Sequence, residues 1–131
     1  MTTKTASCSC GQLSVTCEGD PVRVSLCHCF ACQKRTGSLF GVAARYKREN
    51  VKIEGRTTTY RPLSDSGNRN ELHFCPTCGS TVYWELEKEP ETIMVAVGAF
   101  ADADFPKPAK SFYEERRHRW LELPDDVERI F

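Results

Sequence analysis

Seven of the eight cysteines fall into closely spaced groups, and this spacing is the strongest chemical signal in the sequence. The groups are Cys8 with Cys10, then Cys27 with Cys29 and Cys32, and finally Cys75 with Cys78. Zinc binds thiolates tetrahedrally at about 2.3 Å, so cysteines on one tight turn can reach the same ion. The spacing therefore predicts that the chain binds metal, and zinc is the expected ion.

The segment Cys75-Pro-Thr-Cys78-Gly is the clearest of these ligand pairs. Pro76 presets part of a tight turn, and Gly79 can adopt the positive φ that points backbone N–H groups at the sulfurs. A Cys-x-x-Cys pair also occurs in disulfide redox sites, which is the rival interpretation. The other clustered cysteines favour metal binding over redox exchange.

The number of ligands suggests how the cysteines divide between ions. Structural zinc sites are closed by four protein ligands, whereas catalytic sites have three and keep one position open. We expect the pairs to form a closed structural site from Cys8, Cys10, Cys75 and Cys78. An open second site is then left to Cys27, Cys29 and Cys32. Spacing alone does not force this division, because the open site could be completed by Cys17, His28 or His73.

Each of these three additional side chains also has an interpretation without ligation. Cys17 shares a strand face with Leu13 and Val15, which favours a buried apolar thiol. Neighbours in an extended strand point to opposite faces, so His28 is expected to support the ligands or to lie at the surface. His73 is expected to pack or to hydrogen-bond near the ligands.

Hydrophobic patterning predicts a mostly β fold of short antiparallel strands with little helix. Alternating apolar positions favour strands that begin at Leu13 and at Val22. Further strand candidates are 39–46, 51–53, 57–61, 72–74, 82–86, 93–97 and 110–116. A helical turn is expected over 30–35 and ends at Gly37. Loops are expected at 64–70 and 101–110, and a packed terminal segment at 120–123.

Length and composition predict a single zinc-binding domain over residues 1–131. Lys and Arg together number 18, as do Asp and Glu, so the formal charge of zero gives no attraction to nucleic acid or acidic membranes. The N-terminal residues lack an apolar signal core, and no apolar run approaches the roughly 20 residues that span a bilayer. We therefore expect a cytoplasmic protein without nucleic-acid or membrane partners, in a reducing compartment where disulfides are rare.

Together these motifs resemble the glutathione-dependent formaldehyde-activating enzyme family, which also contains the centromere protein V domain. The similarity extends over nearly the whole chain, and the combination of its pieces is specific. The matching segments are Cys8-Ser-Cys-Gly11, Leu26-Cys-His-Cys-Phe-Ala-Cys-Gln-Lys-Arg-Thr-Gly37, Phe74-Cys-Pro-Thr-Cys-Gly-Ser80, Val95-Ala-Val-Gly98 and Trp120-Leu-Glu-Leu123.

The resemblance implies a tent-like β fold that holds two zinc ions per chain. It implies that the structural zinc is held by Cys8, Cys10, Cys75 and Cys78. It further implies that the catalytic or substrate-facing zinc is held by Cys27, Cys29 and Cys32. The activity that it implies is the condensation of glutathione with formaldehyde to S-hydroxymethylglutathione, which is classed among the carbon–sulfur lyases.

An open three-cysteine zinc site is suited to capturing a small thiol. Free thiols have a pKa of about 8.5 and are mostly protonated at neutral pH, whereas zinc favours the thiolate. Three thiolates already donate charge to the ion, so we expect thiol capture rather than carbonyl activation. Lys34, Arg35 and Arg45 are candidates to bind the carboxylates of a peptide-like thiol, although a solvated basic surface also explains them. Phe30 and Phe40 are candidate pocket walls or ordinary packing residues.

Two other functions are compatible with the cysteine pattern. One is a zinc-stabilised binding module without catalysis, which the centromere protein resemblance allows but the lack of a basic extension disfavours. The other is a thiol-based redox or metal sensor in which Cys17 acts together with the open three-cysteine site.

Overall fold

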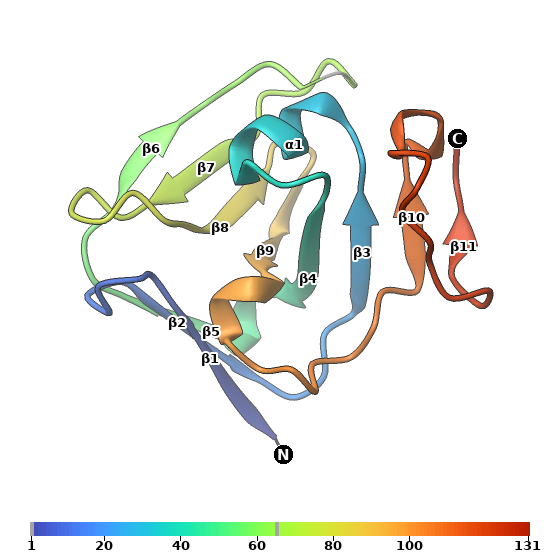
Figure 1. Ribbon diagram of the computed structural model, residues 1–131. Coiled ribbons are helices and arrows are strands. Elements are labelled where there is room, and N and C mark those ends of the chain that lie inside the picture. The colour runs from blue at the N-terminus through green and yellow to red at the C-terminus, as the bar shows by residue number, and fades with distance from the viewer. Residues whose placement is uncertain (1, 65) are drawn as a thin grey trace.

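The computed structural model describes residues 2–64 and 66–131, which form mainly short β-strands (Figure 1). The strands are β1 (Thr3–Ser7), β2 (Ser14–Glu18), β3 (Arg23–Cys27), β4 (Gly41–Lys47), β5 (Val51–Glu54), β6 (Thr58–Tyr60), β7 (Glu71–Phe74), β8 (Thr81–Leu86), β9 (Glu89–Ala96), β10 (Lys110–Phe112) and β11 (Glu128–Arg129). The helical elements are α1 (Phe30–Thr36) and the short 3-10 segments η1 (Arg48–Asn50), η2 (Val97–Phe100) and η3 (Glu114–Arg116). The predicted mostly β fold with little helix is therefore confirmed.

In the part of the chain that the structure describes, the strands form a three-stranded sheet, β1-β2-β5, and an eight-stranded sheet, β11-β10-β3-β4-β9-β8-β7-β6. β10 and β11 lie at one edge of the larger sheet and β6 lies at the other (Figure 1). Most neighbouring strands are antiparallel, but β10 runs parallel to both β3 and β11. The larger sheet is therefore mixed at this edge rather than antiparallel throughout, because a long connection returns the chain from β9 to the far side of β3.

The main hydrophobic core lies between the sheets and is built from alternate residues of their strands. Val15 and Cys17 of β2 are fully buried, and they belong to the same cluster as Ala44 and Val95 of the larger sheet. The expected buried apolar thiol at Cys17 is therefore confirmed. Burial raises the pKa of Cys17 to about 12, so this thiol stays protonated at neutral pH.

A smaller apolar cluster lies on the opposite face of the larger sheet. Strand register places Tyr60, Leu72, Trp84 and Met94 side by side on β6, β7, β8 and β9. Trp84 and Met94 are buried, whereas Tyr60 is exposed at the sheet edge. α1 lies over this face. Its residue Arg35 stacks its guanidinium on Trp84, with Cζ 4.2 Å from the ring centroid. The cysteine-bearing helix is thus held beside an apolar surface.

Capping interactions define both ends of α1. Cys29 precedes the helix, and its Sγ accepts a hydrogen bond from the backbone N–H of Cys32 at 3.3 Å. Gly37 ends the helix with a φ of 71° and donates its N–H to the carbonyl of Gln33 at 2.8 Å. The helical turn expected over 30–35 is confirmed and extends by one residue, to Thr36.

Among the described residues, we find no helix with the length and apolar character needed to cross a membrane.

The flanks of the predicted elements differ most from expectation. A strand is expected over 110–116, but β10 ends at Phe112 because Tyr113 adopts a left-handed φ of 56° and leads into η3. The 120–123 segment is expected to pack, but Trp120 is 73% exposed. Val22 was expected to begin a strand, but β3 begins one residue later, at Arg23, and the Val22 side chain is exposed.

Candidate metal centres and adjoining groove

Turns that belong to different sheets bring cysteine sulfurs together. Cys8 and Cys10 follow β1, Cys75 and Cys78 lie between β7 and β8, and their sulfurs all lie within 4.8 Å of one another. We term these residues the four-cysteine group. The Cys10 sulfur lies 3.6 Å from that of Cys8 and 3.7 Å from that of Cys75. A tetrahedron with metal–sulfur bonds of about 2.3 Å has sulfurs about 3.8 Å apart, so the group has the dimensions of a zinc site.

The turn of Cys75 and Cys78 directs polar hydrogens at its sulfurs. Thr77 donates its backbone N–H to the Cys75 sulfur at 3.3 Å. Gly79 has the predicted positive φ, 81°, and its N–H closes the turn on the Cys75 carbonyl at 2.8 Å. The Ser80 hydroxyl beside Cys78 lowers the pKa of that thiol to about 5. The turn therefore favours negative charge on sulfur, which is the state that metal binding requires.

Cys27, Cys29 and Cys32 form a second group at the junction of β3 and α1. Their sulfurs also lie within 4.8 Å of one another, and we term them the three-cysteine group. Hydrogen bonds from the Cys27 and Cys32 thiols lower the pKa of Cys29 to about 2, and the contacts of Cys27 with Cys29 and Cys32 raise the pKa of Cys27. The two neighbouring thiols thus stabilise a thiolate at Cys29. A divalent cation would allow all three to ionise, so this donor set also fits zinc.

The side chains considered as alternative ligands do not join either group. Within the described residues, no further His, Cys, Asp or Glu ligand atom converges with the sulfurs of the three-cysteine group. Cys17 is buried in the main core, and its raised pKa makes it a poor partner for thiol exchange. The sensor hypothesis that relied on Cys17 therefore loses its support.

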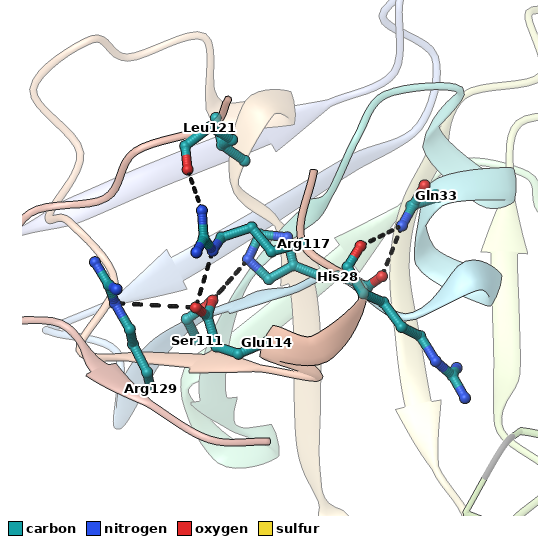
Figure 2. Close-up of polar contacts among 8 residues, drawn as sticks. His28, Gln33, Ser111, Glu114, Arg117, Leu121 and Arg129 are labelled. Atoms are coloured by element: carbon teal, nitrogen blue, oxygen red, sulfur yellow. Dashed lines mark hydrogen bonds and ion pairs between the residues drawn. The ribbon is translucent and has the colours of Figure 1, made fainter. Parts of the chain in front are cut away.

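His28 is a buried support for the three-cysteine group rather than a surface residue. Its Nε2 lies 3.0 Å from the Ser111 hydroxyl and 3.0 Å from a Glu114 carboxylate oxygen (Figure 2). Glu114 also accepts hydrogen bonds from the Ser111 hydroxyl at 2.6 Å and from Arg117 Nε at 3.1 Å. Burial lowers the pKa of His28, so its ring is neutral. Sequence analysis missed Ser111 and Glu114, because they are more than 80 residues away in the chain.

His73 has the packing and hydrogen-bonding role that was expected. Its ring stacks on Tyr83 with centroids 4.4 Å apart, and its Nε2 lies 2.9 Å from a Glu85 oxygen. Glu71, directly opposite Glu85 on the neighbouring strand, completes a cluster whose ligand atoms lie within 4.8 Å. Arg48 forms an ion pair with Glu85, so positive charge already lies beside these carboxylates. The sequence alone does not show that these two glutamates lie opposite each other on neighbouring strands.

Arg35 presents a guanidinium that is oriented but unpaired. It stacks on Trp84 and passes over Gly41, where a Cβ atom would lie only 2.6 Å from its Nη2. Within the described residues, no hydrogen bond or ion pair joins this guanidinium to another side chain or carbonyl. Stacking fixes its position and leaves its N–H groups free, which is the arrangement of an anion receptor.

Two depressions of different character meet at Arg35. The polar cavity, about 520 Å³, lies between α1, the start of β4 and the turn at Ser80, and the apolar groove, about 720 Å³, runs from Cys29 and Cys32 along β6 to β8. The residues that line both are Arg35, Gly79 and Thr81. The apolar part of the groove is lined by Tyr60, Pro62, Leu63, Leu72, Phe74 and Trp84. Of these two depressions, it is the groove whose described lining includes residues of the three-cysteine group, Cys29 and Cys32.

The basic residues proposed to bind substrate divide into two sets. Lys34 and Arg35 both line the apolar groove. Arg45 instead pairs with Glu89 at 2.6 Å and lies four residues along β4 from Gly41, which separates their Cα atoms by about 13 Å. The structure therefore brings two of the three basic candidates to the groove and holds the third elsewhere.

The aromatic candidates divide in the same way. Phe40 lines the polar cavity and contacts the buried His28 ring edge-on, with centroids 6.2 Å apart. Phe30 is 56% exposed and carries the Arg116 guanidinium over its ring at 4.7 Å. Phe40 is thus a cavity wall, whereas Phe30 covers the outer side of α1.

A family model described as "Glutathione-dependent formaldehyde-activating enzyme" matches residues 3–116. The chain belongs to this family. The matched region contains the four-cysteine group, the three-cysteine group and α1. The resemblance inferred from the cysteine motifs is therefore confirmed.

Members of the formaldehyde-activating family with similar sequences occur in fungi. A Fusarium vanettenii protein is 29% identical over 98 residues, covering 68% of this chain and 52% of the relative. A Colletotrichum graminicola protein is 34% identical over 89 residues, covering 60% and 45%. Both carry the name "Putative glutathione-dependent formaldehyde-activating enzyme". The chain thus spans about half the length of these curated relatives.

A solved structure shows the same fold at low sequence identity. The crystal structure of a Rhodobacter sphaeroides protein, a structural genomics target, superimposes with a TM-score of 0.58 and 20% identity. The match covers 76% of this chain and 90% of the other. It supports the sheet architecture described above.

Proposed function

We propose that this member of the formaldehyde-activating family is a zinc-dependent enzyme of the carbon–sulfur lyase type. Its reaction would join a small thiol, glutathione or a similar molecule, to formaldehyde or another aldehyde, or cleave the adduct. The observation that carries this proposal is the three-cysteine group, which offers one ligand fewer than a closed zinc site and opens onto a groove with an unpaired guanidinium.

We assign different roles to the two cysteine groups. The four-cysteine group would hold a structural zinc ion, because it supplies a full tetrahedral donor set. The three-cysteine group would hold a second zinc ion, which gives two ions per chain. Zinc bound there would keep an incoming thiol deprotonated at neutral pH. In this proposal the whole chain acts as one zinc-binding unit in the reducing cytoplasm, where its thiols stay available.

The chain's own side chains would orient the thiol substrate. Arg35 offers free N–H groups in a fixed plane, and a carboxylate is the anion that such a plane binds best. Lys34 provides a second positive charge at the groove. The thiol proton leaves sulfur, the sulfur bonds to the aldehyde carbon, and the carbonyl oxygen takes up a proton. Atoms and electrons balance without an oxidant or reductant.

Metal analysis combined with a thiol titration tests this function. The purified chain should contain two zinc ions, and cobalt substitution should give thiolate charge-transfer bands. Glutathione should change the cobalt spectrum, whereas S-methylglutathione, which lacks a free thiol, should not. A spectrum that no small thiol changes would contradict the enzyme proposal and would favour a zinc-stabilised binding module.

A further inference from the structure

The apolar groove is much larger than formaldehyde requires. Its volume of about 720 Å³ lies within the range of sites that enclose drug-sized ligands. A water molecule occupies about 30 Å³ in the liquid, and formaldehyde has only two non-hydrogen atoms. A one-carbon aldehyde would therefore leave nearly all of the groove in contact with water.

The walls of the groove are apolar and continuous with the three-cysteine group. Cys29 and Cys32 lie at one end, and Trp84 forms part of the floor. Tyr60 and Leu63 keep 60% and 61% of their surfaces exposed on the rim. A ligand in the groove would remove both from water, and exposed apolar patches of this kind commonly mark binding sites.

Glutathione is a poor match for these walls. It carries two carboxylates and an ammonium group, but no acidic residue occurs among the described residues that line the groove. The basic residues of the groove, Lys34 and Arg35, belong to α1 beside the cysteines. Charged groups placed against the apolar walls of β6 to β8 therefore lose hydration without gaining partners. The polar cavity on the other side of Arg35 offers the hydroxyls of Thr36, Ser80 and Thr81. The site therefore has a polar half that suits a peptide-like thiol and an apolar half that does not.

We propose that the apolar groove binds the carbon body of an aldehyde larger than formaldehyde, with an aromatic or branched aliphatic chain. This inference rests on the proposed function. The peptide-like part of the thiol occupies the polar cavity with its carboxylate on Arg35, and its sulfur reaches past Arg35 to the three-cysteine group. The aldehyde body lies on Trp84 and Tyr60. The reaction is the same addition, in which the carbon–sulfur bond forms, the carbonyl π bond breaks and the thiol proton moves to oxygen.

Kinetics with two aldehydes test the inference directly. Rates above the uncatalysed background are measured with glutathione and either 3-phenylpropanal or formaldehyde. We expect kcat/KM for 3-phenylpropanal to be at least about tenfold higher, because one buried methylene alone is worth about tenfold or more in an apolar pocket.

Substitutions on the groove rim locate the effect. The double variant Tyr60→Ser with Leu63→Ser should lower kcat/KM for 3-phenylpropanal about tenfold and change that for formaldehyde less than twofold. Both side chains are exposed, so the fold should tolerate the change. Val22→Ser is the matched control, because Val22 is also 61% exposed and lies outside the groove lining.

A binding measurement supplements the kinetics. The chain has two tryptophans, Trp84 and Trp120, and Trp120 is 73% exposed. In Trp120→Phe the fluorescence therefore reports on Trp84 in the groove. Unreactive 3-phenylpropanol should change this fluorescence saturably, and the rim double variant should weaken its binding about tenfold.

The possible outcomes separate this inference from the proposed function. A preference for formaldehyde, unaffected by the rim double variant, would overturn the inference and leave the proposed function standing. Absence of an enzyme-dependent rate with both aldehydes, in protein that contains its zinc, would overturn the proposed function and this inference with it. A loss of activity toward both aldehydes in the folded double variant would also contradict the inference, because the rim would then serve the thiol.

Discussion

The four-cysteine group and the three-cysteine group use the same ligand chemistry in different structural settings. The first joins the segment after β1 to the turn between β7 and β8, and the hydroxyls of Ser9 and Ser80 also meet across this junction at 3.0 Å. The second is contained within residues 27–32 and links β3 to α1. One group ties together segments from different sheets, whereas the other is local and faces a groove.

The two groups also differ in what supports them without metal. The loop of the three-cysteine group is anchored by His28, which is buried against Ser111 and Glu114. In the four-cysteine group, Cys8 and Cys75 are buried in the main core, whereas Cys10 and Cys78 are exposed on segments that are far apart in the sequence. A metal ion contributes most to folding where it closes a long loop, since closing a longer loop costs more conformational entropy. We therefore expect the four-cysteine group to stabilise the fold and the three-cysteine group to be stabilised by it.

The largest expected effect is that of Cys8→Ser. Removing this buried ligand should release the structural zinc and separate the β1–β2 hairpin from the β7–β8 turn. Structural zinc in small domains contributes about 10–16 kcal/mol to folding in peptide systems. The variant should lose most of its β-sheet signal in circular dichroism and much of its bound zinc.

Cys27→Ser introduces the same chemical change in the three-cysteine group and is compared with Cys8→Ser. Bound zinc should fall from two ions to one per chain, while the circular dichroism spectrum and the cooperative unfolding transition persist. Equal collapse of Cys8→Ser and Cys27→Ser would contradict the division of roles.

Glu114→Ala should have the next largest effect, because it removes the buried anchor of the three-cysteine group. The Glu114 side chain is 1% exposed, and its loss leaves His28 and Arg117 without their carboxylate. His28 is neutral and the Arg117 side chain is 26% exposed, so the loss should cost about 1.5–3 kcal/mol, as for a hydrogen bond to a charged group. Urea unfolding should show a loss of this size, and Glu115→Ala, an exposed neighbour in η3, should change stability by less than about 0.5 kcal/mol. Equal stability of the two variants would show that the anchor is not needed.

Gly41→Ala should affect the groove with little change in stability. The new Cβ would lie 2.6 Å from Arg35 Nη2, so the flexible guanidinium must move off Trp84. Loss of this preorganised receptor should raise the KM for glutathione about tenfold, as expected for one charged hydrogen-bonded contact. Gly98→Ala is the control, because Gly98 lines the same polar cavity and has no atom within 4 Å of its Cβ position. An unchanged KM for glutathione in Gly41→Ala would show that Arg35 does not bind this substrate.

The parts of this arrangement that the sequence predicts are those set by local spacing. The turn from Cys75 to Gly79 and the helix after Cys29 follow from a few neighbouring residues, and both form as expected. The partner of His28 could not be predicted, because parallel pairing of β10 with β3 brings Ser111 to this position. Arg45 lies outside the lining of the groove for a related reason, since each residue of an extended strand advances the chain by about 3.3 Å.

The smallest expected effect is a difference in acid release of zinc. Protons compete with metal for thiolates, so a site whose thiols have a higher pKa loses its ion at a higher pH. The pKa values do not order the two groups, because each contains one thiol with a lowered pKa, Cys78 or Cys29, and one with a raised pKa, Cys10 or Cys27. The groups differ in ligand number instead, and the three-cysteine group, with one thiolate fewer, should release zinc first as the pH falls, by about one pH unit.

A zinc-sensitive dye should record this release in two phases during stepwise acidification. Cys27→Ser should lack the phase at higher pH and keep the one at lower pH, because only the four-cysteine group then holds zinc. Release in a single phase, or loss of the lower-pH phase in Cys27→Ser, would show that the two groups do not differ in the way their ligand numbers require. The order of release thus tests, without any substrate, whether one thiolate fewer separates a reactive metal centre from a structural one on the same chain.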